Sequence, residues 1–451
     1  MGDLHGLARS PRKELRMRAA VTSALLSAMF LVVYGTTNWL TSQRGDVPTW
    51  HASWELAIPF MPLLILPYMS IDLFFVTAPF VCGSRREMNV LVKRLVFANL
   101  VAAAFFVLMP FQLGFERATV GGWQGLVFDT FREMDLPYNL FPSLHIAQLG
   151  VLAAVYGGHT RGVLWVACQA WFGLIIASTV LTHQHHLIDI AGGVLLGAFA
   201  CQLFRESPAH SPVLHNVRLG AYYAAGAIAL VIPAALLGPW GAFLVWPAAA
   251  LVLVAAGYLG LGPAIFRKEN GRPPISTRIA LAPVLIGQYL SLLYYRRQCR
   301  PWDTVVPGVL IGRKLNDAEA AEAVREGVTA VLDLTGEFSE AAPFLERTYR
   351  NIPVLDLTAP TPEQLREAVA FITAEAECGT VYVHCKIGYS RSAAVIGAYL
   401  LASGQAMTAD EAVALLRRAR PSIVIRAEAL TAIRGWAPHA EKMAGVQGRV
   451  A

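Results

Sequence analysis

The chain has 451 residues, of which 55% are hydrophobic and only 15% are charged, and its mean hydropathy is +0.48. Such a composition excludes an ordinary soluble globular protein and is typical of a protein of the lipid bilayer. The formal net charge of +6 does not indicate nucleic-acid binding, because the Lys and Arg residues gather beside apolar segments, which is the pattern that sets membrane topology.

The N-terminus carries a basic cluster, from Arg9 to Arg18, in front of an apolar run that is long enough to cross a bilayer. No small-residue cleavage site follows this run, so we expect it to be retained as a signal anchor. Because basic loops stay in the cytoplasm, the cluster places the N-terminus inside.

Eight segments have the length and apolar composition of membrane spans, which need about 20 residues. They are residues 19–40, 56–81, 95–113, 146–156, 162–181, 187–204, 219–237 and 240–261. A ninth stretch, residues 279–295, lies between Arg278 and Arg296 and either spans the membrane or lies flat on it. Basic residues on both sides favour a segment that lies in the interface. In this orientation the basic loops are cytoplasmic, and so is the chain after Cys299.

Beyond Pro301 the composition becomes that of a soluble protein. Short β-branched runs alternate there with helical patterns, which predicts an α/β domain. The runs are residues 305–311, 329–334 and 381–384, and the helical patterns are residues 317–325, 362–377 and 409–420. We expect four parts, which are an N-terminus with the first span (1–55), a membrane core (56–204), further spans with a linker (205–300) and the α/β domain (301–451).

Two histidine clusters lie at the ends of membrane segments, within residues 139–145 and 178–189. Ionisable groups are costly in a bilayer, so these clusters indicate a functional site. His185 and Asp189 are four residues apart on one helical face, so the carboxylate can orient the imidazole of a nucleophilic His185. His145 is the expected proton donor to the leaving alkoxide.

Two further residues of these clusters are expected to bind phosphate. Ser143 can donate a hydrogen bond to a phosphate oxygen, and His183 is a candidate phosphate ligand. The alternative for the histidines is an interfacial position in which they reach toward lipid headgroups.

The patterns P-S-x-H at residues 142–145 and S-x6-H-x3-D at residues 178–189 resemble signatures of the type 2 phosphatidic acid phosphatase superfamily, particularly its branch similar to inositol phosphorylceramide synthases. The resemblance covers about residues 56–204 and implies a six-helix membrane core that acts through a phosphohistidine. In the orientation set by the basic loops, both clusters are expected on the outer, periplasmic side. Thr179 stands where many members have arginine, and the first signature, a lysine with an Arg-Pro pair, is absent. Arg117 is the expected phosphate-binding cation in its place.

The segment 381–392, VYVHCKIGYSRS, joins an apolar strand to a helical run through a short loop. A loop that enters a helix N-terminus points backbone N–H groups inward, which forms an anion cradle and lowers a thiol pKa. Cys385 is therefore expected to attack phosphorus as a thiolate. Arg391 offers a planar fork for two phosphate oxygens, and Gly388 supplies the positive φ that the loop needs. The alternative is a buried structural cysteine.

A thiolate nucleophile also needs a proton donor for the leaving oxygen, and Asp356 is the expected one. Asp333, within a predicted strand, is the alternative. Ser392 is expected to donate to the sulfur as it leaves in the second step. The other cysteines are scattered without any C-x-x-C pair, so neither a disulfide framework nor a metal site is expected.

The H-C-x5-R-S pattern resembles the dual-specificity branch of the protein tyrosine phosphatase superfamily, over about residues 305–425. Lys386, directly after the cysteine, is also found in lipid-directed members, such as the phosphatidylglycerophosphate and phosphoinositide phosphatases. A cation at this position suits an anionic headgroup.

The sequence thus predicts a multi-pass α-helical membrane domain with eight or nine spans in all, followed by a soluble α/β cysteine-phosphatase domain. We expect an integral protein of a bacterial inner membrane that hydrolyses phosphomonoesters of phospholipids or their precursors at both sites, without a metal or another cofactor. The bilayer is an expected partner, and nucleic acid is not. One alternative is a phosphotransferase of the inositol phosphorylceramide synthase type. Another is a membrane-tethered tyrosine or dual-specificity phosphatase whose histidine site is inactive.

Overall fold

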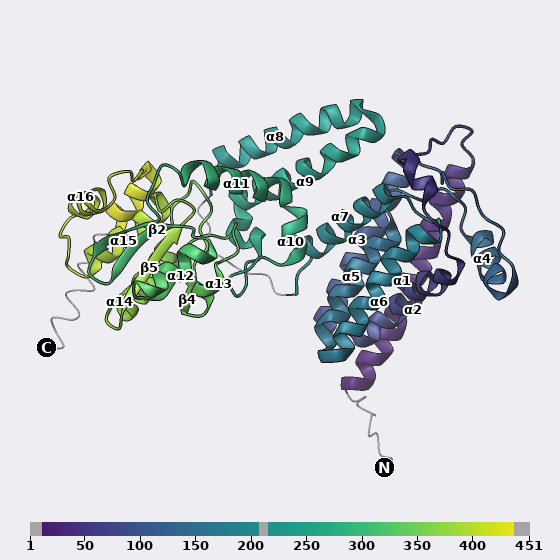
Figure 1. Cartoon of the computed structure of the whole chain (residues 1–451), viewed down its shortest axis with the longest axis horizontal. Coiled ribbons are helices and arrows are strands. Elements are labelled where there is room, and N and C mark those ends of the chain that lie inside the picture. Colours follow the sequence, from purple (N-terminus) through teal and green to yellow (C-terminus); the bar gives the residue numbers. More distant parts are fainter. Residues whose placement is uncertain (1–10, 207–214, 437–451) are drawn as a thin grey trace, which may run out of the picture. The chain divides into compact units, whose positions relative to one another are not determined.

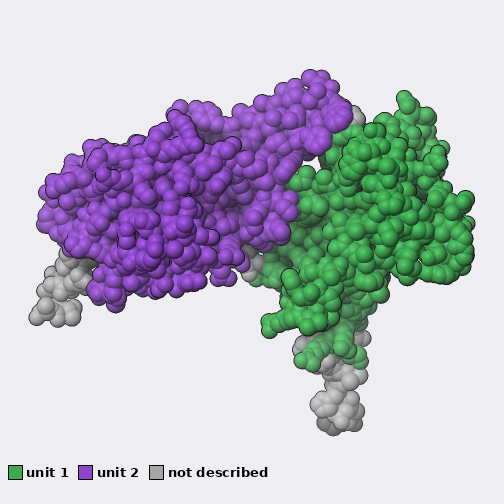
Figure 2. All heavy atoms as spheres, viewed as in Figure 1, with its two compact units in different colours: residues 1–208 green, residues 209–451 purple. Residues whose placement is uncertain are grey.

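The computed structural model describes residues 11–206 and 215–436. The chain folds as two compact units, residues 1–208 and residues 209–451, which are coloured separately in Figure 2. Each unit has its own buried core. The predicted histidine site belongs to the first unit and the predicted cysteine site to the second.

The first unit is a helical bundle (Figure 1). Its α-helices are α1 (Pro11–Ser42), α2 (Ile65–Val81), α3 (Arg85–Leu108), α4 (Gly122–Met134), α5 (Leu144–His159), α6 (Gly162–Leu181) and α7 (Leu187–Leu203). Two glycines let α7 approach α5 closely. A Cβ on Gly193 would lie 2.5 Å from the Ser143 carbonyl oxygen, and one on Gly197 would lie 2.8 Å from that of Ala147. Small residues therefore bring the two histidine segments together, as they do in other membrane bundles.

Six helices in the described residues are long and apolar enough to cross a membrane. They are Arg12–Ser42, Pro62–Val81, Arg85–Leu108, Gly162–Leu181, Val217–Leu236 and Ala242–Phe266. Helices α5 and α7, at 16 and 17 residues, are shorter than the about 20 residues of a typical span. The sequence therefore predicted more full-length spans than the six that meet this criterion.

The predicted start of the third span was wrong. Helix α3 begins at Arg85 and not at residue 95, because the Ser84 hydroxyl caps it by accepting a hydrogen bond from the Glu87 backbone N–H. Four basic residues that precede the predicted span and that we expected in a cytoplasmic loop lie on this helix, namely Arg85, Arg86, Lys93 and Arg94. One of them, Arg94, is buried and donates to the Phe204 carbonyl oxygen at 3.0 Å.

The second unit begins with a helical hairpin, α8 (Val217–Leu236) and α9 (Ala242–Ala256), whose helices run side by side (Figure 1). The hairpin continues through η4 (Gly257–Leu261) and η5 (Gly262–Phe266). The ninth apolar stretch forms α10 (Ile275–Ala280) and α11 (Ala282–Tyr295). With 14 residues, α11 is about 21 Å long, which is too short for a hydrocarbon core of about 30 Å. Its length disfavours the spanning alternative.

The rest of the second unit is an α/β domain around a five-stranded sheet of order β1-β2-β5-β3-β4. The strands are β1 (Trp302–Val306), β2 (Val309–Arg313), β3 (Val328–Asp333), β4 (Thr348–Asn351) and β5 (Thr380–Cys385). Strands β2, β5, β3 and β4 run parallel to one another, and the edge strand β1 is antiparallel to β2. The expected α/β class is confirmed. The single strand expected at residues 305–311 was wrong, because Gly308, at φ +78°, turns the chain between β1 and β2.

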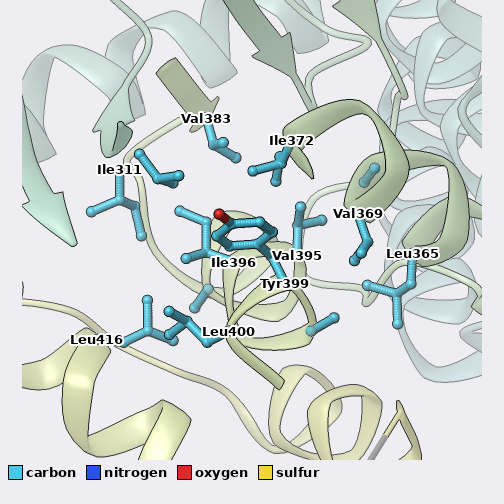
Figure 3. Packing of buried hydrophobic residues seen from close by; sticks show 14 of the residues in the cluster. Ile311, Leu365, Val369, Ile372, Val383, Val395, Ile396, Tyr399, Leu400 and Leu416 are labelled. Carbon is cyan, nitrogen blue, oxygen red and sulfur yellow. The ribbon is translucent and has the colours of Figure 1, made fainter. Parts of the chain in front are cut away.

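Helices cover both faces of this sheet. They are α12 (Asp317–Arg325), α13 (Ala342–Leu345), α14 (Pro362–Ala376), α15 (Ser390–Ala402) and α16 (Ala409–Ala419). Side chains of α14, α15 and α16 pack with those of β2 and β5 around Tyr399 (Figure 3). Residues of α12 and α13 pack against Val331 and Tyr382, which point to the other face of the sheet. Helix α15 is buried along most of its length, so the loop before it is held by the core of the domain.

Candidate active site

Cys385 is the last residue of β5 and Ser390 the first of α15, so a short loop joins the central strand to the N-terminus of the buried helix. Gly388 lies in this loop at φ +75°, and a Cβ there would lie 2.4 Å from the Gly312 carbonyl oxygen. Any larger residue would therefore clash and be strained. The predicted cradle between strand and helix N-terminus is present.

The Cys385 side chain is 4% exposed and lies at the bottom of this loop. Burial by itself raises the pKa of the thiol, but the Arg391 guanidinium, together with hydrogen bonds from Ser392 and the Tyr389 backbone, holds this pKa below its ordinary value. These are the causes expected for an activated cysteine. The site favours the thiolate form, as the sequence predicted.

Arg391 is fixed from two sides before any substrate arrives. Its Nη2 lies 2.7 Å from Glu337 Oε1 and 3.2 Å from Asp356 Oδ1, and its Nη1 donates to the Val354 carbonyl oxygen at 2.8 Å. Burial alone would lower the pKa of Arg391, but the carboxylates of Glu337 and Asp356 raise it, so the fork stays charged. Glu337 follows β3 in a loop without a recognisable motif, so no sequence pattern pointed to it.

Asp356 lies in the cavity with the cysteine, on the segment between β4 and α14. Its Oδ2 accepts a hydrogen bond from Lys386 Nζ at 2.6 Å. Burial raises the pKa of this carboxyl group, but Arg391 and Lys386 hold the pKa below its ordinary value. The expected proton donor is therefore in place but ionised in the unliganded site.

Asp333, the alternative donor, lies elsewhere. It is fully buried and accepts hydrogen bonds from the Tyr349 hydroxyl and the Thr335 hydroxyl, each at 2.7 Å. Lys268, from the segment after the hairpin, forms an ion pair with it. Asp333 does not line the cavity of Cys385, so this alternative is wrong.

The cavity around Cys385 has a volume of about 410 Å³. Asp356, Lys386 and Arg391 line it together with Cys385. Ser392 is fully buried beside the sulfur and does not line the cavity. One wall comes from α11, whose Gln288 Oε1 accepts a hydrogen bond from Lys386 Nζ at 2.9 Å. The sequence did not predict that α11 reaches this site.

One cluster in the described residues has the side chains of a metal site. Ligand atoms of Asp333, Glu340 and His384 lie within 4.8 Å of one another. The Lys268 ammonium already pairs with Asp333, and His384 Nε2 lies 2.8 Å from Glu340 Oε2. Burial lowers the pKa of His384, but Glu340 and Asp333 raise it above its ordinary value. Lys314 Nζ also lies 3.6 Å from Glu340 Oε1, so three basic groups face the two carboxylates, which makes this a buried ion cluster of the domain.

The first unit brings the two principal histidines to one cavity of about 600 Å³, which His145 and His185 line together with Asp135. His185 Nδ1 lies 3.4 Å from Asp189 Oδ2, as their spacing predicted. His145 Nε2 lies 3.0 Å from the Tyr68 carbonyl oxygen. Asp135, which no sequence motif indicated, accepts a hydrogen bond from the Tyr34 hydroxyl at 2.7 Å.

The remaining predicted phosphate ligands do not line this cavity. The Ser143 hydroxyl caps α5 by accepting a hydrogen bond from the Ile146 backbone N–H. His183 Nε2 lies 2.9 Å from the Ile58 carbonyl oxygen, and its ring stacks on Phe115. Arg117 donates to the Asp135 carbonyl oxygen at 2.8 Å, so it lies next to the cavity. The structure thus assembles the expected nucleophile, acid and orienting carboxylate without a phosphate clamp among the described residues.

Comparisons with known proteins concern the α/β domain. Residues 312–437 match the family described as the dual specificity phosphatase catalytic domain. The chain is 35% identical to tyrosine-protein phosphatase CDC14 of Candida albicans over 109 residues, which are 23% of this chain and 19% of that protein. It is 30% identical to phosphatidylglycerophosphate phosphatase PTPMT1 of Arabidopsis thaliana over 135 residues, or 28% of this chain and 40% of that protein.

A second protein of the same plant, phosphatidylglycerophosphate phosphatase PTPMT2, is 31% identical over 150 residues, which are 30% of this chain and 65% of that protein. The chain therefore spans less than two thirds of the length of each of these three relatives. The family match contains both Cys385 and Arg391, the two residues that the loop geometry makes central. Residues 312–437 thus form a dual-specificity phosphatase catalytic domain, in a chain that also carries six helices apolar enough to cross a membrane.

Proposed function

We propose that the chain is a membrane-anchored cysteine phosphatase that hydrolyses phosphomonoesters of membrane phospholipids. The observation that carries the proposal is one cavity that contains Cys385, Arg391, Asp356 and Lys386. Two relatives that carry the name phosphatidylglycerophosphate phosphatase support the lipid class. The hairpin α8–α9 in the same unit supports it too, because a tethered site meets lipid substrates at high effective concentration.

The first step transfers the phosphoryl group to the enzyme. The Cys385 thiolate attacks phosphorus, the bond from phosphorus to the lipid oxygen breaks, and Asp356 gives its proton to the leaving alkoxide. Arg391 and the backbone N–H groups of the loop stabilise the phosphoryl oxygens. Asp356 obtains its proton as the substrate binds, because the phosphate charge offsets Arg391 and Lys386 and thereby raises the pKa of the carboxyl group.

The second step regenerates the enzyme. A water molecule attacks the phosphorus of the phosphocysteine, Asp356 takes its proton, and the bond from phosphorus to sulfur breaks. Ser392 donates a hydrogen bond to the sulfur as it leaves as a thiolate. The products are inorganic phosphate and the dephosphorylated lipid, and no metal takes part in this sequence of steps.

The substrate class is tested with the full chain reconstituted in vesicles. We expect kcat/KM for phosphatidylglycerophosphate in the bilayer to exceed that for a phosphotyrosine peptide by at least about tenfold, which corresponds to about 1.4 kcal/mol. Release of inorganic phosphate measures both rates, and Cys385→Ser sets the background. A preference for the peptide would contradict the lipid class and favour the protein phosphatase alternative.

Asp356→Asn is expected to lower kcat for a lipid substrate by about 10²- to 10³-fold, because the leaving alkoxide then departs without a proton. For an aryl phosphate, whose acidic phenol leaves without needing a proton, kcat should fall far less in this variant. In the wild type kcat falls as the pH rises through the Asp356 pKa of the substrate complex, and this alkaline limb should vanish in the variant. Asp410→Asn, at an exposed aspartate, is the control. Equal losses for both leaving groups would show that Asp356 is not the acid.

A second phosphatase activity at the histidine site is supported by the cavity that His145 and His185 share. We propose that His185 forms a phosphohistidine there while Asp189 orients its ring. The activity is tested in a chain with Cys385→Ser, where the remaining release of phosphate from phosphatidic acid should fall by at least about 10²-fold on His185→Ala. His159→Ala, at the other end of α5, is the matched control. Unchanged turnover in the His185 variant would contradict this activity.

A further inference from the structure

Helix α11 exposes an apolar stripe along one face. Ile286, Tyr289, Leu290 and Tyr294 are between 53% and 63% exposed, and their spacing places them on neighbouring turns of the same side. Leu292, on another side of the helix, is buried against the phosphatase domain. In a soluble protein a contiguous apolar surface of this kind marks a binding face.

The same helix forms a wall of the cysteine cavity. Gly287, Gln288, Ser291 and Tyr295 of α11 line this cavity, and Gln288 contacts Lys386. The stripe and the cavity wall therefore belong to adjacent sides of one short helix. Whatever the stripe binds lies next to the mouth of the active site.

Other apolar side chains extend the stripe around the mouth. Leu357, directly after Asp356, is 36% exposed, and Val424 is 52% exposed. Both line the cavity. The charged interior of the site, with Lys386 and Arg391, is thus bordered by apolar groups, which suits an amphipathic substrate with a phosphorylated head and an apolar remainder.

Contacts inside the second unit tie α11 and the acid loop to the hydrophobic hairpin. Trp246 of α9 donates to the carbonyl oxygens of Ile279 and Ala280, each at 3.2 Å, at the end of α10 and directly before α11. The Tyr258 hydroxyl, just after α9, donates to the Asp356 carbonyl oxygen at 2.8 Å. Through the Tyr258 contact, the acid loop of the cavity lies at the C-terminal end of α9, in a hairpin whose two helices are long enough to cross the bilayer.

Charge at the two ends of the helix agrees with a lipid surface. Arg278 precedes α11 and Arg297 follows it, and both are exposed. Cations beside an amphipathic helix are attracted to anionic headgroups, while aromatic side chains such as Tyr289 and Tyr294 prefer the level of the headgroups.

We propose that α11 lies in the headgroup layer of an anionic bilayer and forms the entrance through which the phosphorylated headgroup of a lipid reaches Cys385 from the plane of the membrane. The stripe faces the acyl chains, and Gln288 on the adjacent side orients Lys386 toward the headgroup. This inference rests on the proposed lipid phosphatase function and adds the route by which the substrate enters.

The test uses the full chain in vesicles of phosphatidylcholine and phosphatidylglycerol that carry phosphatidylglycerophosphate. The double variant Leu290→Ser and Tyr294→Ser is expected to lower turnover of the lipid at least tenfold, mainly through a higher KM, while turnover of a soluble aryl phosphate stays within twofold. The rate that remains in the Cys385→Ser variant is subtracted from each measured rate, so that only turnover at the cysteine site is compared. Met407→Ser is the matched control, because Met407 is an apolar side chain that is 79% exposed and lies outside the cavity lining.

Each other outcome overturns the proposal. If the wild type turns over the lipid and the double variant does so at the same rate, the proposed entrance is wrong, while the lipid substrate class still holds. If the wild type does not turn over the lipid, both the proposed entrance and the lipid substrate class are wrong. If the double variant lowers turnover of a phosphotyrosine peptide as much as turnover of the lipid, the stripe binds a protein instead of a bilayer. If the double variant loses aryl phosphate turnover as well, the single variants Leu290→Ser and Tyr294→Ser are measured, and equal losses for both substrates in them exclude the entrance.

Discussion

Replacing Cys385 with serine is expected to abolish the metal-independent turnover of aryl phosphates, with a fall in kcat of about 10⁴-fold or more. The serine hydroxyl is not ionised near neutral pH, whereas Arg391 and the loop hold the pKa of the cysteine thiol below its ordinary value. The side chain keeps its size and place, so binding of inorganic phosphate to the loop should remain. Initial rates and phosphate binding by calorimetry measure the two effects separately.

Cys378→Ser is the matched control, because this cysteine lies in the same domain but is exposed and outside the cavity lining. Its rate should equal that of the wild type. Turnover of an aryl phosphate that survives Cys385→Ser and disappears on His185→Ala would assign that share to the histidine site. Turnover that survives both substitutions would contradict covalent catalysis at either residue.

Local patterns predicted much of the phosphatase domain. The helices expected at residues 317–325 and 362–377 form as α12 and α14, because each begins at a residue that caps it, Asn316 and Thr361. The loop from Cys385 to Arg391 follows from its own composition, since strand, glycine and helix start lie within one short segment. Such features depend on neighbours in the sequence, and the sequence therefore contains their signal.

Features that depend on distant segments left no such signal. Glu337 reaches Arg391, and Gln288 reaches Lys386, only because the fold brings separate elements together. Lys268, a basic residue that follows an apolar segment in the sequence, is buried against Asp333. His183, although it lies within a motif, turns toward Ile58 and Phe115 instead of the cavity. A motif predicts which residue types come together, whereas the direction of each side chain is decided by packing.

The same reasoning explains why the α11 wall was missed. Its apolar residues dominate the hydropathy pattern and predict contact with the membrane, while its contribution to the active site consists of one glutamine and three small or aromatic residues. These residue types occur on any helix surface. Only the position of α11 beside Lys386 gives them a role, and this position follows from the docking of the segment on α9.

Arg391→Lys is expected to lower kcat/KM by about 10²- to 10³-fold although the positive charge is kept. The guanidinium Nη2 contacts both Glu337 and Asp356, and Nη1 donates to the Val354 carbonyl oxygen, so its plane is fixed before substrate binds. An ammonium group has no such plane and cannot offer two parallel hydrogen bonds to the phosphoryl group. Steady-state rates with an aryl phosphate measure the loss.

The Lys variant also changes the thiol, which separates catalysis from simple damage to the fold. Arg391 is the first of the groups that lower the pKa of Cys385, and a lysine holds its charge less rigidly at the sulfur. The acid limb of the rate profile, where activity appears as the thiol ionises, should therefore move to higher pH in the variant. Arg350→Lys, at an exposed arginine paired with Glu367, should move neither the rate nor the limb. If Arg391→Lys keeps the wild-type rate and profile, the fork is not what holds the phosphoryl group, and the cysteine site needs another cation.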